Sequence, residues 1–270
     1  MKKCVLWILV AVFFCAVTYG GCGGSSSNLA IVDPEESEQE SLPTNDDPVP
    51  ESTGSKVDLS TLTKHYTAQS GDTLTGRLYR DDLSIHIADG ATVTLKDVSI
   101  ENGSYGYPPR YGIYCQGNAT LILEGTNVVK GASFQGSRRS GIYVKEGNTL
   151  TIMGSGSLTA QGDGGGAPGI GAGYTLDRIT GMSNTDCGNI VIDGGTVNAI
   201  GGDGAPGIGS SNGTHGNITI TNNVSRVAVT AGNYAKYSIG SLDHPENSGT
   251  ITIGGVVTEP TTANPFIYEP

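Results

Sequence analysis

The feature that most constrains the fold of this chain is a sequence repeat with a period close to 28 residues. Six similar segments follow one another, and each joins a glycine corner to a short alternating strand: DGATVTL, GNATLIL, GNTLTI, GNIVI, GNITI and GTITI. Their glycines stand at positions 90, 117, 147, 188, 216 and 249, so the spacings are 27, 30, 41, 28 and 33 residues. A period of this size is typical of solenoid proteins, in which stacked repeats share one core.

Each repeat is expected to contain three short strands. The second strand carries apolar pairs such as Val98 with Ile100, and the third strand is centred on a single isoleucine. Alternation of this kind between Gly and Asn corners is typical of strands joined by tight turns. Connections between parallel strands are almost always right-handed. The sequence therefore predicts an all-β fold, a right-handed parallel β-helix (solenoid) of about six to seven coils, preceded by a disordered linker.

Stacked repeats should align their inward side chains in columns. The column of the first face is predicted to contain Leu95, Leu123, Ile152, Ile192, Ile220 and Ile253. The column of the third face is predicted to contain Ile113, Ile142, Ile170, Ile208 and Ile239. One corner is predicted to hold Asn118, Asn148, Asn189 and Asn217, whose amides would bond to the coils above and below. This structural role is favoured over glycan attachment, although Asn118 and Asn217 also fit N-x-[ST].

Residues 1–21 have the pattern of an export signal, with two lysines, an apolar run of about 14 residues and then small residues. The segment Tyr19-Gly20-Gly21-Cys22 resembles the cleavage box of bacterial lipoproteins, although Tyr19 stands where that family usually has Leu. The resemblance implies that Cys22 is lipidated and that the protein is exported, lipid-anchored to the bacterial cell envelope and exposed at its surface. An ordinary signal cleaved near Gly20 is the alternative.

The other boundaries follow from composition. Residues 22–60 form a predicted disordered linker rich in Ser, Pro and Glu, with eight acidic and no basic side chains between positions 31 and 51. Residues 61–255 are the predicted β-helix, with an inserted loop at 174–187 that accounts for the spacing of 41. Residues 256–270 are predicted to end the coil as a C-terminal cap. Most of the formal net charge of −11 therefore belongs to the linker, and no nucleic-acid partner is indicated.

Two glycine-rich stretches, GDGGGAPGIGAG from 162 and GGDGAPGIGSS from 201, contain G-x-G-x-x-G. A dinucleotide site needs this motif between a strand and a helix, but Pro168 and Pro206 interrupt it and no helical pattern follows, so no nucleotide is expected. Asp163 and Asp203 are predicted to occupy the same corner of consecutive coils, where two carboxylates about 5 Å apart would form a metal site for calcium. A simple Asp-Gly turn is the alternative.

A catalytic triad is not indicated, because no G-x-S-x-G motif presents a nucleophile and the histidines of the body fall at turns or outward positions. Cys115 and Cys187 lie about two coils, or about 10 Å, apart. This separation exceeds the reach of a disulfide unless the inserted loop bends back. Two unpaired thiols are therefore expected, with a bridge as the alternative.

The best functional signal is the gathering of aromatic and basic residues in the loops between the second and third strands, which all emerge at one corner. These predicted ligand-binding residues are Tyr105, Tyr107, Arg110, Tyr111, Phe134, Arg138, Arg139, Tyr234 and Tyr237. Tyrosine rings suit the faces of sugar rings, and arginine suits the carboxylates of acidic sugars. A row repeated at steps of about 5 Å fits a linear polysaccharide or cell-surface glycan. Packing of these aromatics onto the coil is the alternative.

With its GDTLTG opening (71–76) and its G-N-x-x-x-[IL] corners, the stretch from Tyr66 to about Gly255 resembles bacterial cell-surface right-handed β-helix proteins classed as carbohydrate-binding domain proteins. That family is similar in fold to pectate lyases, which implies a polysaccharide partner, acidic in some members and bound with calcium. We therefore expect a non-catalytic, membrane-anchored polysaccharide-binding module. A polysaccharide lyase, which needs a calcium-binding carboxylate cluster beside a basic residue, and a structural surface adhesin are the alternatives.

Overall fold

The computed structural model describes residues 54–80, 82–101, 111–132, 139–173, 175–177, 181–183, 186–241 and 245–270. The predicted signal, Cys22 and most of the predicted linker lie outside these residues. Five predicted ligand-binding residues also lie outside them: Tyr105, Tyr107, Arg110, Phe134 and Arg138. What was expected of these residues therefore stays a prediction.

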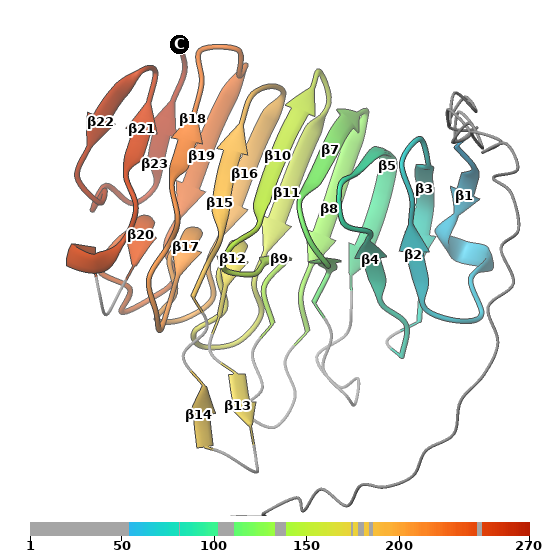
Figure 1. Ribbon diagram of the computed structural model, residues 1–270, viewed down its shortest axis with the longest axis horizontal. Helices are drawn as coiled ribbons and strands as arrows, with labels where there is room; N and C mark the ends of the chain where they lie inside the picture. The colour runs from blue at the N-terminus through green and yellow to red at the C-terminus, as the bar shows by residue number, and fades with distance from the viewer. Residues whose placement is uncertain are drawn as a thin grey trace, which may run out of the picture. The chain divides into compact units, whose positions relative to one another are not determined.

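The described residues form two long sheets of parallel strands, joined by bends and two short 3-10 turns, η1 (Leu59–Thr61) and η2 (Pro245–Asn247) (Figure 1). The third face of the coil is a seven-stranded sheet in the order β2 (Tyr66–Ala68), β4 (Ile85–Ile87), β6 (Ile113–Cys115), β9 (Ile142–Val144), β12 (Ile170–Ala172), β17 (Ile208–Ser210) and β20 (Ile239–Ser241). Every neighbouring pair in this sheet is parallel.

The first and second faces together form a 14-stranded sheet, because the long strand β5 (Ala91–Glu101) belongs to both. The first half of β5 pairs with β7 (Ala119–Glu124) and its second half with β8 (Thr126–Lys130). The first face continues through β10 (Thr149–Gly154), β15 (Asn189–Ile192), β18 (Ile218–Ile220) and β21 (Ile251–Ile253). The second face continues through β11 (Ser157–Gln161), β16 (Thr196–Ile200) and β19 (Arg226–Thr230). The chain is a parallel β-helix, as predicted.

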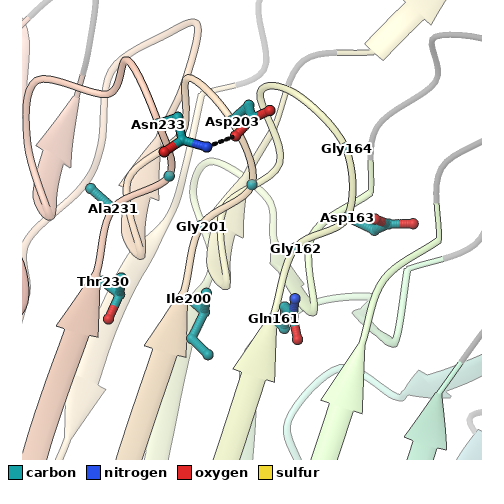
Figure 2. A pocket seen from close by; sticks show the side chains of 12 residues that line it. Gln161, Gly162, Asp163, Gly164, Ile200, Gly201, Asp203, Thr230, Ala231 and Asn233 are labelled. Atoms are coloured by element: carbon teal, nitrogen blue, oxygen red, sulfur yellow. Dashed lines mark hydrogen bonds between the residues drawn. The ribbon is translucent and has the colours of Figure 1, made fainter.

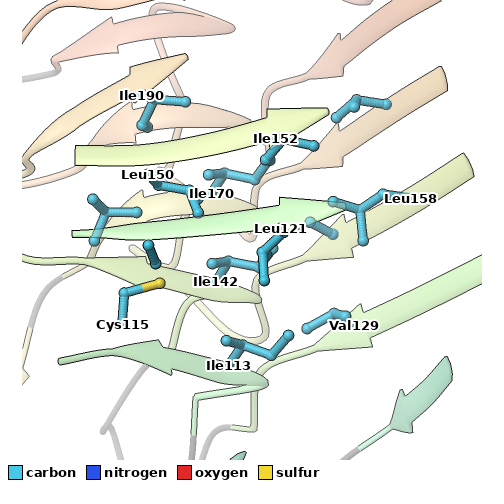
Figure 3. Packing of buried hydrophobic residues seen from close by; sticks show 14 of the residues in the cluster. Ile113, Cys115, Leu121, Val129, Ile142, Leu150, Ile152, Leu158, Ile170 and Ile190 are labelled. Carbon is cyan, nitrogen blue, oxygen red and sulfur yellow. The ribbon is translucent and has the colours of Figure 1, made fainter. Parts of the chain in front are cut away.

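The core is built of apolar columns (Figure 3). The predicted third-face column is confirmed and begins one coil earlier, because Ile85 pairs with Ile113. The first-face column is correct from Ile152 onwards but wrong before it. Leu121 is the residue in register with Ile152, and Val93 is in register with Leu121, whereas Leu123 and Leu95 had been predicted at these positions. A shift of two residues leaves every side chain on the same face of a strand, so alternation alone could not reveal the error.

The asparagine corner is a hydrogen-bonded ladder that includes three of the four predicted asparagines. The Oδ1 atom of Asn118 accepts from the Thr149 N–H at 2.9 Å, and Oδ1 of Asn189 accepts from the Asn217 N–H at 2.8 Å. Asn217 continues the ladder to the next coil, where its Oδ1 accepts from the N–H of Thr250 at 2.9 Å. The inclusion of Asn148 was wrong, because the residue at this level is Thr149.

One polar residue stands in the inward column of the second face. Asn127 is buried between Val98 and Leu158 of the adjacent coils. Its Oδ1 accepts from the Val98 N–H at 3.0 Å, and its Nδ2 donates to the carbonyl oxygens of Glu124 at 3.0 Å and Ser157 at 3.1 Å. These three bonds satisfy the amide and fix the bend between β7 and β8.

Both ends of the coil are covered. At the start, β1 (Lys56–Asp58) pairs in parallel with β3 (Thr73–Leu78), and Leu59 is buried over the first coil, so ordered structure begins before the predicted linker boundary at residue 60. At the end, the chain reverses at Gly254-Gly255, and β22 (Val256–Thr258) pairs antiparallel with β21. Thr261 then bridges to β20, and β23 (Phe266–Tyr268) pairs antiparallel with β19. The tail therefore retraces the last circuit and covers all three faces.

The predicted insertion leaves the coil. Strands β13 (Thr175–Asp177) and β14 (Gly181–Ser183) form an antiparallel pair of their own, which projects below the coil in Figure 1. Cys115 and Cys187 are free, as expected, and both are buried, which raises the pKa of each thiol to about 12. Among the residues placed by the structure, we find no helix with the length and apolar character that a membrane span needs.

Candidate functional site

The corner between the second and third faces contains the glycine-rich stretches. Three consecutive coils leave the second face here, after Gln161, Ile200 and Thr230, which are level with one another. The backbone ladder continues past the strand ends, since the Gly162 N–H donates to the carbonyl of Ile200 and the Gly201 N–H to that of Thr230, both at 2.9 Å. A Cβ at Gly162 would lie 2.0 Å from a carbonyl oxygen of its own bend. Glycine is therefore required here for close backbone approach.

Two matching turns follow, at residues 202–205 and 232–235. In each turn the N–H of the last residue donates to the carbonyl of the first, at 2.9 Å and 3.2 Å respectively. The third position of both turns has left-handed backbone, with φ of 70° at Gly204 and 66° at Tyr234. This conformation suits glycine and is disfavoured for a residue with a Cβ. Tyr234 therefore occupies a position that a glycine fills one coil earlier.

The three bends surround an open cleft of about 470 Å³ (Figure 2). Its lining comes from residues 161–164, 200–203 and 230–233, one segment from each coil. The lining includes two carboxylates, one amide from glutamine, one from asparagine and a threonine hydroxyl, but no basic side chain. The cleft is therefore polar, and each of three consecutive coils contributes one segment to it.

Asp163 and Asp203 both line this cleft but lie at different levels. A Cβ at Gly202 would lie 1.9 Å from the carbonyl oxygen of Gly164, and the Gly166 N–H donates to the carbonyl of Asp203, so Asp163 lies ahead of the residues that face Gly202 and Asp203. Asp163 stands seven residues before Ile170, whereas Asp203 stands five residues before Ile208, so the two carboxylates occupy different positions in their bends. Figure 2 shows Asp203 turned toward Asn233 and Asp163 pointing away from both.

The hydrogen bond of Asp203 is to a neutral group. Its Oδ1 accepts from Nδ2 of Asn233 at 2.8 Å. Asp163 instead contacts the preceding coil, where its N–H donates to the Arg139 carbonyl at 3.3 Å. Within the described part of the chain, no cluster of three or more His, Cys, Asp or Glu side chains is placed to hold a metal ion. The predicted calcium site therefore rests on these two offset carboxylates alone.

Tyr111 and Arg139 belong to a different group of side chains, on the outer side of the third face. Tyr114 and Tyr143 stack there in one column, with ring centroids 5.2 Å apart, and Tyr111 stacks on Tyr143 at 4.4 Å. The Arg139 guanidinium lies 4.8 Å over the Tyr111 ring and donates to its hydroxyl at 2.9 Å. Burial raises the pKa of Tyr111. Tyr111 and Arg139 thus hold one another in a packed cluster, which fits the packing alternative for these two residues.

The two remaining predicted tyrosines differ in their surroundings. Tyr234 follows Asn233 directly, its side chain is 94% exposed, and it makes no ring contact with any residue that the structure describes. Tyr237 is half-buried, with Nζ of Lys236 4.7 Å from the ring centroid. Of the described tyrosines in the predicted set, Tyr234 is therefore the one that offers its ring to solvent beside the cleft.

Sequence reasoning missed Asn233 and the column of Tyr114 and Tyr143. A signal for the tyrosines was present, because each follows a column isoleucine, Ile113 or Ile142, and must point outward on the same face. A signal for Asn233 was also present, because Ile200 pairs with Thr230 and Asn233 therefore occupies the turn position that Asp203 has one coil earlier.

Comparison of the chain with protein-family models, with curated proteins and with solved structures finds no significant match in any of the three. The parallel β-helix therefore rests on the observed strand pairing. The resemblance to carbohydrate-binding β-helix proteins stays a hypothesis.

Proposed function

We propose that this protein is a non-catalytic surface module that binds polysaccharide and is held to the cell envelope through a lipidated Cys22. The observation that carries the proposal is the open polar cleft built from three stacked coils. Its lining segments recur at steps of about 5 Å along the coil axis, so successive units of a linear polymer can meet successive coils. Small-molecule sites are typically enclosed and mostly apolar, which this cleft is not.

The composition of the cleft supports a sugar ligand. Carboxylate, amide and hydroxyl groups together accept and donate the hydrogen bonds that sugar hydroxyls make. Tyr234, next to the lining residue Asn233, adds an exposed aromatic ring. Aromatic rings bury the apolar faces of ligands while keeping a polar rim in water.

The proposal is tested by native gel electrophoresis of the folded protein through gels that contain soluble polysaccharides, with absorbance of the unsaturated uronate product followed in parallel. Retention without growth of that absorbance is the expected result. Growth of the absorbance would instead establish the polysaccharide lyase alternative. Unchanged mobility with every polysaccharide would refute the binding proposal and favour an adhesin.

A cleft-filling variant assigns any retention to this site. Thr230 lines the cleft, and Thr219 is a matched threonine at an outward position of the first face. Thr230→Trp should abolish retention, because the indole fills the cleft, while Thr219→Trp should bind like the unmodified protein. Equal binding by both variants would place the polysaccharide elsewhere on the surface.

A further inference from the structure

Asp203 and Asn233 line the cleft and Tyr234 directly follows Asn233, and these three residues have the chemistry of a sugar subsite. The Asp203–Asn233 hydrogen bond at 2.8 Å uses one carboxylate oxygen and one amide hydrogen. Oδ2 of Asp203 and Oδ1 of Asn233 keep their acceptor capacity among the described residues, and Nδ2 of Asn233 keeps its second hydrogen. Two adjacent sugar hydroxyls, each a donor and an acceptor, match this set of two acceptors and one donor.

The third member of the group, Tyr234, has an unusual backbone conformation for a residue with a side chain. Tyr234 has a φ of 66° in the turn position where the preceding coil has Gly204. Its ring is 94% exposed, so packing against the protein does not explain the residue. A non-glycine residue held in a disfavoured backbone conformation at an exposed site points to a functional role. A sugar ring lying on Tyr234 would bury the apolar area that the free protein leaves in water.

The charge of the cleft restricts which sugar fits. Asp203 makes no ion pair with any described residue, and no residue of the lining is basic. The carboxylate of a uronic acid placed beside Asp203 would meet a like charge, and the described lining offers no cation to compensate it. An uncharged sugar makes the same hydroxyl hydrogen bonds without this repulsion.

The geometry points to a calcium-independent subsite for an uncharged pyranose unit, in which Asp203 and Asn233 bind adjacent hydroxyls and Tyr234 stacks on the ring. This inference rests on the proposed function, since it names the sugar class that the cleft selects. It differs from the predicted calcium site in assigning Asp203 to a hydroxyl instead of a metal ion.

The test compares retention of the full-length protein by neutral glucan, mannan and galactan with its retention by polygalacturonate, each with calcium and with a chelator. We expect retention by at least one neutral glycan, unchanged by the chelator, and none by polygalacturonate. Tyr234→Gly and Asn233→Ala should each weaken that retention about tenfold or more. Asp203→Asn keeps an acceptor oxygen for Asn233 but removes the charge, so it should raise the ratio of polygalacturonate to neutral-glycan binding.

Matched controls exclude general surface effects. Tyr79→Ala removes another exposed tyrosine, 70% exposed, and Glu259→Gln removes another exposed carboxylate, so both should bind like the unmodified protein. Retention only by polygalacturonate, or only with calcium, would overturn the subsite and leave the proposed function standing. Neutral-glycan retention that survives both Tyr234→Gly and Asn233→Ala would also overturn it. Failure to bind any glycan would refute the proposed function itself.

Discussion

Replacing Tyr234 by glycine should leave the fold as stable as before or slightly more stable, although it removes a large side chain. The φ of Tyr234 is 66°, and the tyrosine ring is 94% exposed. A left-handed backbone costs a residue with a Cβ about 1–2 kcal/mol, which glycine avoids. Glycine loses about 0.5–1 kcal/mol more backbone entropy on folding, and little apolar burial is lost. The net change is an increase of about 0–1 kcal/mol in the free energy of unfolding.

The reciprocal substitution provides the matched control. Gly204 has a φ of 70°, and nothing lies within 4 Å of a Cβ built on it, so Gly204→Ala adds strain without a clash. It should lower the free energy of unfolding by about 1 kcal/mol. In a domain of this size, 1 kcal/mol corresponds to a shift of about 2–4 °C in the melting temperature.

Urea unfolding and thermal melting of both variants measure these changes. Most substitutions destabilise a protein by about 1 kcal/mol, so the sign for Tyr234→Gly is the informative quantity. A loss of more than 1 kcal/mol in this variant would show that Tyr234 stabilises the fold, and the argument that the residue is kept for a ligand would fail.

Three further predictions concern the core and the pH dependence of stability. Ile152→Ala should lower the free energy of unfolding by about 2–5 kcal/mol in urea titration, because it empties a buried column, whereas Thr151→Ala on the outer side should change it by less than about 1 kcal/mol. Asn127→Leu should destabilise by about 1–3 kcal/mol, since it leaves the Val98 N–H buried without an acceptor; a neutral or stabilising result would show that this bond is dispensable. Burial lowers the pKa of His215, so on acidification the unfolded chain binds a proton that the folded protein excludes. The contribution of His215 to stability should therefore be complete above the unfolded pKa of about 6.5 and should fall as the pH decreases toward the folded pKa. In His215→Gln, the urea midpoint should vary less between about pH 7.5 and 5.5 than in the unmodified protein.

The fold could be predicted largely from the repeat. Strands with alternating apolar residues must bury one face, and a single coil cannot do so alone, so a period near 28 residues leads directly to stacked coils. The isoleucine column from Ile113 to Ile239 could be identified because one isoleucine stands in each short third strand, which leaves no second choice of register.

The sequence predicted the location of the candidate site but not the contacts between its side chains. The corner was predicted, and Asp203 and Tyr234 were both assigned to it. The position of Asn233 in the coil after Asp203 follows from the repeat, but the side-chain hydrogen bond between the two residues is seen only in the structure. The sequence also could not decide the environment of Tyr111 and Arg139, because the same residues are compatible with an exposed row and with the packed cluster that the structure shows.

The sequence by itself determined the three short strands of each repeat, the corners between them and the aliphatic composition of the core, because these follow from local alternation and from the repeat period. Only the tertiary structure decided which residue of one coil is in register with which residue of the next. A slip of two residues along a strand preserves the buried face, and an extra residue in a bend changes the register of the residues that follow it. That is why Thr149, and not Asn148, belongs to the ladder, and why Asp163 and Asp203 do not stack.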